Sequence, residues 1–264
     1  TKRFGEVLAV DAIDLRVGTG EIYGFLGPNG AGKTTTIRAL LGMIRPSAGN
    51  VKVLGQVLGA GGRGPWAQVG HLVESPSAYP ELTVHENLDI ARRLYGLQNP
   101  KAVDDVMEKL SIASYSKRKA GTLSMGNLQR LGLARAMIHN PSLLILDEPA
   151  NGLDPAGMVE IRELLVDLAH NHDVTVFMSS HILTEVDRLA TRIGIIHKGE
   201  LIEELDAARM EELRAKQLVI AVHDLEAAHK LLAKYEGLSI QDGRIAIKDP
   251  RAVKAPEMIA TILV

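Results

Sequence analysis

The sequence Gly-Pro-Asn-Gly-Ala-Gly-Lys-Thr occupies positions 27–34, between an apolar run at 22–26 and a run of helical periodicity at 37–41. It fits the spacing G-x-x-x-x-G-K-[ST] between a strand and a helix. The glycines let backbone N–H groups turn toward one cluster of phosphate oxygens, and the helix start adds its positive end. We therefore predict a loop that binds a nucleoside triphosphate through Gly27, Pro28, Asn29, Gly30, Ala31, Gly32, Lys33, Thr34 and Thr35.

Within this loop, Lys33 is expected to reach the β- and γ-phosphates and Thr34 to bind magnesium. A chance glycine-rich turn is the alternative to a phosphate loop. By itself the loop also fits a GTPase, a small-molecule kinase or a helicase, so the function depends on the other motifs.

Two carboxylates, Asp147 and Glu148, follow a second apolar run at 143–146. Ligands of open α/β sheets bind beyond the carboxyl ends of the strands, so both acids should face the loop. Asp147 is expected on the magnesium, directly or through water, and Glu148 as the base that polarises the attacking water. His181 follows the apolar run at 174–178 and is expected at the γ-phosphate. The alternatives are a turn acid that ends a core strand and a histidine that caps a helix or lies on the surface.

Apolar runs of strand length alternate with helix-period segments, which favours a largely parallel sheet covered by helices. Residues 83–140 contain no strand-like run and begin with the capping-box pattern Thr83-Val-His-Glu86, so we expect an inserted helical subdomain. The predicted strands of the sheet are 21–26, 69–73, 143–147, 174–178 and 192–196.

The chain is expected to divide into domains at 1–211 and 212–264. The pattern His-Lys-Gly-Glu at 197–200 predicts a hairpin, and the charged stretch 206–216 predicts a helical linker. Beyond it, a small β-α-β-β unit is predicted from a strand at 217–222, a helix at 225–235 and a hairpin at 238–247. This unit carries no catalytic signature.

Composition excludes several classes of protein. Of 264 residues, 46% are hydrophobic and 23% charged, as in ordinary globular proteins. A net charge of −2 offers no basic face for nucleic acid, and the absence of cysteine excludes a disulfide framework. No apolar run approaches the roughly 20 residues that span a bilayer. The chain begins at Thr1 without a signal-peptide pattern, so we expect the native N-terminus to be missing.

The string Leu-Ser-Met-Gly-Asn-Leu-Gln-Arg at 123–130 precedes a helix-period run and lies shortly before the two carboxylates. This order of motifs resembles the ABC ATPase family. The string is similar to the family's signature motif: Ser124 and Gly126 match its serine and second glycine, whereas Met125 and Asn127 depart from its glycine and glutamine. A serine N-cap with free N–H groups suits a γ-phosphate, with an ordinary N-cap as the alternative.

The resemblance covers about residues 1–204 and implies an α/β fold: a RecA-like P-loop NTPase core of ABC type with an inserted helical subdomain and a small C-terminal α+β appendage. It implies a head-to-tail dimer around two Mg-ATP molecules, in which Ser124 and Gly126 reach the partner's ATP. Phe4 stands where the family has an aromatic that stacks on adenine, unless it is a plain core residue. The Gly-Leu-Asp string that ends in Asp154 is similar to the D-loop, which links the two active sites.

Glu74 stands where the family has the glutamine of its Q-loop. Like charges about 4 Å apart repel by about 4 kcal/mol at an effective dielectric near 20, so a carboxylate beside phosphates requires magnesium or a proton. We hypothesise that Glu74 faces the metal, with a solvated loop acid as the alternative. The strings at 71–76 and 79–88 resemble transporters for lantibiotics and bacitracin-like peptides, in which a glutamate takes this place.

These resemblances imply a bacterial ATP-hydrolysing subunit on the cytoplasmic face of the membrane. Its partners would be a second protomer, identical or a close paralogue, and a multi-spanning permease docked around 74–88, for export of an antimicrobial peptide in self-protection. One alternative is a soluble ABC ATPase that acts on ribosomes or DNA, which the net charge and the single ATPase core disfavour. The other is a nucleotide-binding regulator without turnover, which Glu148 and His181 disfavour. No nucleic-acid partner is expected.

Overall fold

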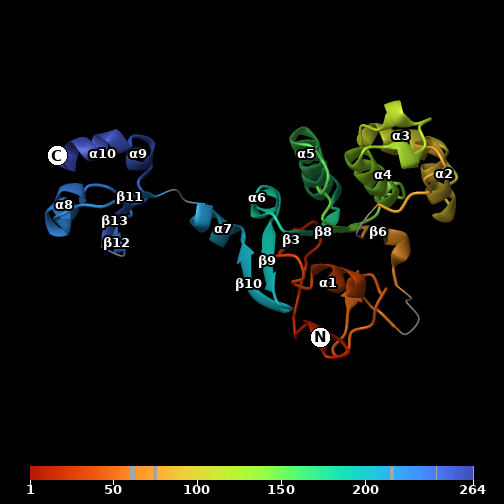
Figure 1. The fold of residues 1–264 in the computed structure, drawn as a ribbon, viewed down its shortest axis with the longest axis horizontal. Helices are drawn as coiled ribbons and strands as arrows, with labels where there is room; N and C mark the ends of the chain where they lie inside the picture. The colour runs from red at the N-terminus through yellow and green to blue at the C-terminus, as the bar shows by residue number, and fades with distance from the viewer. Residues whose placement is uncertain (60–63, 74–75, 215–216, 242, 264) are drawn as a thin grey trace. The chain divides into compact units, whose positions relative to one another are not determined.

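The computed structural model describes residues 1–59, 64–73, 76–214, 217–241 and 243–263 (Figure 1). Internal contacts divide the chain into two units, Thr1–Asp206 and Ala207–Val264. The expected boundary at 211/212 falls inside helix α7 (Ala207–Arg214). The division comes earlier because β10 (Glu200–Asp206) pairs along its length with β9 and so belongs to the sheet of the first unit.

A six-stranded sheet in the order β10-β9-β3-β8-β7-β6 forms the centre of the first unit. The five strands from β9 to β6 run parallel to one another. The edge strand β10 runs antiparallel to β9, to which the predicted hairpin connects it. All five strands predicted for this sheet are confirmed to within two residues at either end: β3 (Ile22–Leu26), β6 (Val69–Leu72), β7 (Leu143–Asp147), β8 (Thr175–Ser180) and β9 (Arg192–His197).

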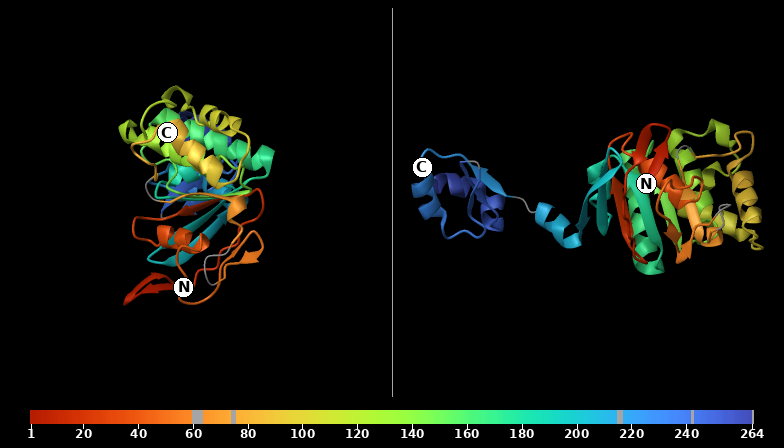
Figure 2. Two further views of the ribbon diagram at one scale, coloured as in Figure 1. Left: turned by 90° about the vertical axis from the view of Figure 1, so that its right-hand side faces the viewer. Right: turned by 90° about the horizontal axis from the view of Figure 1, so that it is seen from below.

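The two faces of this sheet carry different helices (Figures 1 and 2). Successive side chains of a strand point to opposite faces. On β3, Ile22 therefore joins the core under α5 (Pro155–His172), whereas Tyr23 and Phe25 join the core under α1 (Lys33–Leu40). This alternation continues across β7 and β8, so β3, β7 and β8 are buried on both faces. The continuous apolar runs in the sequence reflect this double burial.

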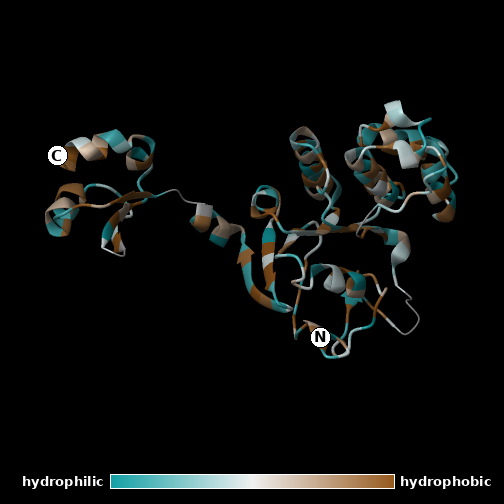
Figure 3. Ribbon diagram, in the orientation of Figure 1, coloured by the Kyte–Doolittle hydropathy of each residue, from teal (hydrophilic) through white to brown (hydrophobic). Residues whose placement is uncertain are grey.

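The predicted helical subdomain consists of α2 (Val84–Leu94), α3 (Lys101–Lys109) and α4 (Met125–Met137). The predicted capping box is confirmed: Thr83 Oγ1 accepts from the Glu86 N–H at 3.2 Å, and the Glu86 carboxylate accepts from the Thr83 N–H at 2.7 Å. The helices show hydrophobic and hydrophilic stripes, as amphipathic helices on a core do (Figure 3). Their buried residues belong to the same core as α5, which fixes α4 beside the sheet.

Gly70 of β6 sets how closely α4 approaches the sheet. A Cβ at this position would lie 2.0 Å from the carbonyl oxygen of Ala136 in α4, a backbone atom that cannot rotate away. We expect Gly70→Ala to lower the free energy of unfolding by at least about 1–3 kcal/mol, as overpacked cores do. Urea unfolding measures this. Gly59→Ala is the control, because no atom lies within 4 Å of its added Cβ, and equal stability of the two variants would contradict the prediction.

Two short hairpins complete the first unit: β1 (Lys2–Phe4) with β2 (Val7–Val10), and β4 (Lys52–Val53) with β5 (Gln56–Val57). A short helix, α6 (Leu183–Val186), follows β8 and packs on β3 and β8. In the portion of the chain that is described, no helix is long and apolar enough to cross a membrane.

The second unit has its own core beside a three-stranded antiparallel sheet, β11-β13-β12. The predicted β-α-β-β order is confirmed, but two short helices after it were not predicted. Each begins at a proline, a favoured first helical residue, so the sequence held a signal for them. The elements are α7, β11 (Leu218–Ile220), α8 (Leu225–Leu232), β12 (Ser239–Gln241), β13 (Arg244–Ile247), α9 (Pro250–Lys254) and α10 (Pro256–Leu263).

Candidate active site

The phosphate loop joins the end of β3 to the start of α1. Gly32 precedes the helix with φ of 109°, and a Cβ there would lie 2.6 Å from the carbonyl oxygen of Ala9. Only glycine meets both constraints. Lys33 opens the helix, is 6% exposed, and donates from its amine to the carbonyl oxygens of Gly27 at 2.7 Å and Pro28 at 3.2 Å. The loop thus wraps around its own lysine.

Asp147 ends β7 directly beside this loop. Its Oδ2 accepts a hydrogen bond from Thr34 Oγ1 at 2.7 Å, which brings the two residues predicted for magnesium together. Its Oδ1 accepts from Ser179 Oγ at 2.5 Å. Ser179 also accepts from the backbone N–H of Glu148 at 3.0 Å. The fully buried Ser179, for which the sequence predicted no role, therefore orients both acids.

Glu148 lies between Lys33 and His181. Its Oε1 is 3.3 Å from Lys33 Nζ, and its Oε2 is 2.8 Å from Nδ1 of His181. An ionised carboxylate only accepts hydrogen bonds, so Nδ1 of His181 is the donor when Glu148 is charged. The backbone of Glu148 has φ of 50°, which is rare for a residue with a side chain. Such strain recurs at functional positions.

A second unpredicted residue holds the backbone of this acid. Gln129 of α4, 3% exposed, donates from Nε2 to the carbonyl oxygens of Glu148 at 3.2 Å and Pro149 at 3.1 Å. The signature segment of the helical subdomain is thereby tied to the end of β7. Gln129 belongs to the string at 123–130, five residues after Ser124, but the sequence did not show that it bonds to the backbone after β7.

The residues present fit a magnesium ion that arrives with a nucleotide. Magnesium commonly takes one or two protein oxygens and completes its shell with phosphates and water, and Thr34 with Asp147 offers such a pair. Over the described ranges, no group of three or more His, Asp or Glu side chains is arranged to hold a metal. The third residue predicted for the metal, Glu74, lies outside the described residues.

The remaining predicted residues lie apart from the loop of the same chain. Ser124 caps α4 by accepting from the Asn127 N–H at 3.3 Å, and a Cβ on Gly126 would lie 3.2 Å from the carbonyl oxygen of Gly152. Asp154 caps α5 by accepting from the Gly157 N–H at 3.0 Å. The signature and D-loop segments are therefore neighbours of each other, and each lies at a helix start that is capped by its own side chain.

Phe4 closes β1 and is 49% exposed, which contradicts the alternative that it is a core residue. The amine of Lys2 lies 4.8 Å from the centre of its ring. An exposed aromatic face is available for stacking, and the stacking on adenine stays a prediction.

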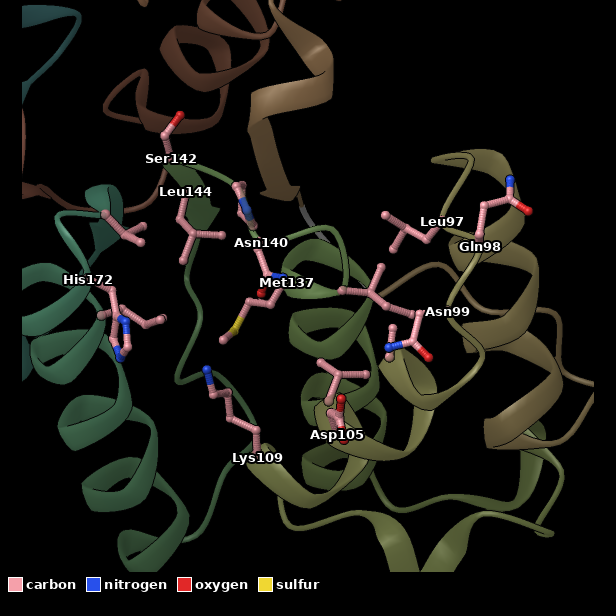
Figure 4. Close-up of a pocket in the computed structure, with 16 residues that line it drawn as sticks. Leu97, Gln98, Asn99, Asp105, Lys109, Met137, Asn140, Ser142, Leu144 and His172 are labelled. Atoms are coloured by element: carbon pink, nitrogen blue, oxygen red, sulfur yellow. The ribbon is translucent and has the colours of Figure 1, made fainter.

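A cavity of about 460 Å³ opens in front of the phosphate loop. Its lining residues are Val7, Leu8, Ala9, Asn29, Gly30, Gly32, Lys33, Thr34, Thr35, Glu148 and Lys198. A cavity of about 590 Å³ elsewhere lies between the helical subdomain and α5, with His172 of α5 on one side and Leu97 and Asn99 on the other (Figure 4). None of the predicted site residues lines this larger cavity, so choosing the active site by cavity volume would give the wrong place.

Residues 10–151 match the model of a family described as ABC transporter, which is more than half of the chain. The chain belongs to the ABC transporter family. This ABC ATPase is 42% identical over 235 residues to the bacitracin transport ATP-binding protein BcrA of Bacillus licheniformis, covering 89% of this chain and 77% of the relative. It is 33% identical over 221 residues to the lantibiotic transport ATP-binding protein SrtF of Streptococcus pyogenes, covering 83% and 94%.

Solved structures of the same fold include a dimeric ATP-binding cassette bound to ADP and Pi. It aligns with a TM-score of 0.70 at 23% identity, over 77% of this chain and 94% of that chain. The predicted fold and the resemblance stated from the motifs are thus confirmed. As an ABC ATPase, the chain binds nucleotide and hydrolyses ATP.

Proposed function

We propose that the chain powers a bacterial ABC exporter of antimicrobial peptides, on the cytoplasmic face of the membrane and with Mg-ATP as its substrate. The observation that carries this proposal is the identity of 42% to a bacitracin transport ATP-binding protein over 89% of this chain. The site geometry supports turnover in place of mere nucleotide binding, because a carboxylate lies between Lys33 and His181.

Each residue of the site takes one role in this proposal. The loop at 27–35 holds the phosphates, and Thr34 and Asp147 hold magnesium, which when bound draws charge from the β- and γ-phosphates. Glu148 accepts the proton of the attacking water, and His181 holds that carboxylate in place through its hydrogen bond. Phe4 stacks on the adenine. Glu74 faces the metal.

Two protomers complete each site in the proposed cycle. Ser124 and Gly126 lie at a helix start that contributes nothing to the cavity of their own chain. A helix start with free N–H groups binds phosphate well, so these residues serve the ATP of a second protomer. Asp154 lies beside them and links the two sites. Closure on ATP and release after hydrolysis then drive the membrane subunit.

The docking surface for the permease, predicted around 74–88, extends in this proposal to a groove between the core and the helical subdomain, which Ser77 also lines. Two cavities of about 410 and 460 Å³ share Met43, His71, Leu94 and Tyr95. Desolvation of the ring, and next the charge of the neighbouring Arg135, lower the pKa of His71. Leu94, at the end of α2, is 78% exposed. Such an apolar, water-exposed surface suits a partner protein.

Isolation of the protein from its own cell in mild detergent tests this function. We expect a multi-spanning membrane protein in fixed ratio after a moderate-salt wash, and loss of that protein from Leu94→Glu while the ATPase activity remains. Leu231→Glu is the matched control, because this exposed leucine lies in the second unit. Ribosomes or DNA in place of a membrane protein would refute the transport function.

A further inference from the structure

The turn between β9 and β10 contributes a lysine to the phosphate cavity. Lys198 lines this cavity together with the phosphate loop and Glu148. The sequence identified residues 197–200 only as a hairpin. Lys198 matches no position of the loop, the acidic strand or the signature segment, so no motif assigns it a role.

The backbone holds this turn against the site. Lys198 has φ of 49° and Gly199 φ of 86°, the two positive values of a tight hairpin turn. The Gly199 N–H donates to the carbonyl oxygen of Ala31 at 2.9 Å, and its own carbonyl accepts from the Asp11 N–H at 2.8 Å. The turn is therefore fastened both to the phosphate loop and to the segment after β2. Two-residue hairpin turns with positive φ favour asparagine at the first position, which Lys198 occupies here. A lysine at positive φ costs backbone free energy, which indicates a role for its side chain.

Lys198 also differs from Lys33 in its charge environment. The amine of Lys33 is already engaged by two carbonyl oxygens and by Glu148 at 3.3 Å. The side chain of Lys198 is exposed and has no hydrogen-bond or ion-pair partner in the described part of the chain. Together with Lys33 and Glu148 it accounts for the charged residues that line the cavity. A polyphosphate in the cavity would therefore meet Lys33, whose charge is paired with Glu148, and Lys198, whose charge is unpaired.

We propose that Lys198 is a nucleotide-binding residue that contacts the phosphate chain at its α- and β-phosphates. Lys33, Glu148 and His181 cluster at one end of the site, which is the end for the γ-phosphate. Lys198 forms no ion pair with Glu148 in the described part of the chain, so its amine lies outside that cluster. Its turn is held instead by Ala31 and Asp11, and a Cβ on Gly199 would lie 3.1 Å from the carbonyl oxygen of Ala9. Residues 7–9 line the same cavity and belong to the hairpin that carries Phe4, the residue proposed for the adenine. This inference rests on the nucleotide site proposed above.

The test replaces Lys198 by asparagine, which removes the charge and keeps a residue that tolerates positive φ. Affinities of the full chain for ADP, ATP and adenosine are measured by calorimetry with magnesium present. Because an exposed ammonium contacts phosphate through a screened interaction, we expect Lys198→Asn to bind ADP and ATP about 3–10-fold more weakly, by similar factors. Adenosine binding should not change, and the loss should shrink at high salt. Lys198→Arg, which keeps the charge, should bind like the unmodified protein.

Lys52→Asn is the matched control, an exposed lysine on β4 that does not line the cavity. Binding of Lys198→Asn equal to that of Lys52→Asn would overturn the inference, as would a loss for ATP with ADP unchanged. Equal thermal unfolding of both variants shows that the turn is intact. If the unmodified protein bound neither nucleotide, the proposed nucleotide site itself would be wrong. That result differs from a Lys198→Asn variant that binds both nucleotides as the unmodified protein does.

Discussion

Glu148→Gln is expected to lower the rate of ATP hydrolysis about 10²–10⁴-fold, the usual contribution of a general base. An amide has nearly the shape of the carboxylate but cannot take a proton from water. The carboxylate of Glu148 is held from both sides, at 3.3 Å from Lys33 Nζ and 2.8 Å from Nδ1 of His181, so its position is well defined. Phosphate release under saturating ATP measures the rate.

The same variant should retain ATP and accumulate a closed dimer, because the phosphate loop and the Thr34–Asp147 pair are unchanged. Size-exclusion chromatography with ATP and magnesium detects that dimer. Glu185→Gln is the matched control: this acid also lies near the site and accepts from Ser180 Oγ at 2.8 Å, but it does not line the phosphate cavity. A Glu148→Gln protein that hydrolyses ATP at the normal rate would exclude Glu148 as the base.

Lys33→Ala is expected to reduce turnover about 10²–10³-fold, the range found when one preorganised electrostatic donor is removed from an active site. Unlike Glu148→Gln, it should also weaken ATP binding. The amine of Lys33 is buried and its position is set by the carbonyl oxygens of Gly27 and Pro28. Without it, the charge of Glu148 loses one of its two partners and repels the γ-phosphate.

Calorimetric titration with ATP, together with the hydrolysis rate, separates these two variants. Lys52→Ala controls for loss of a lysine charge outside the cavity. Lys33→Ala with normal ATP affinity would show that the loop holds the phosphates through backbone N–H groups alone. The pair of variants therefore distinguishes the binding role of one residue from the chemical role of the other.

Much of the fold could be predicted from local signals. The parallel strands β3, β7 and β8 are buried on both faces, so each appears in the sequence as a continuous apolar run. The capping box at Thr83 marks the start of α2, because its two hydrogen bonds involve residues only three positions apart. The helices α9 and α10 were missed because they are short, although a proline opens each.

The site divides in the same way. The phosphate loop, Asp147 and Glu148 each belong to a contiguous pattern whose chemistry requires those residue types. Ser179 and Gln129 do not: one reaches Asp147 from the neighbouring strand, and the other reaches Glu148 from the helical subdomain. Hydrogen bonds of this kind depend on strand register and helix placement, which no single segment encodes.

Local spacing along the chain was enough to identify the family, the phosphate loop and the pair of acids, because distances within one loop or at the end of one strand are set by covalent geometry. The packed fold sets which side chains meet across segments. It placed Glu148 between Lys33 and His181, and it brought the turn at Lys198 to the phosphate cavity. The physical reason is that side chains more than 100 residues apart come within hydrogen-bonding distance only after the sheet order β9-β3-β8-β7 has packed.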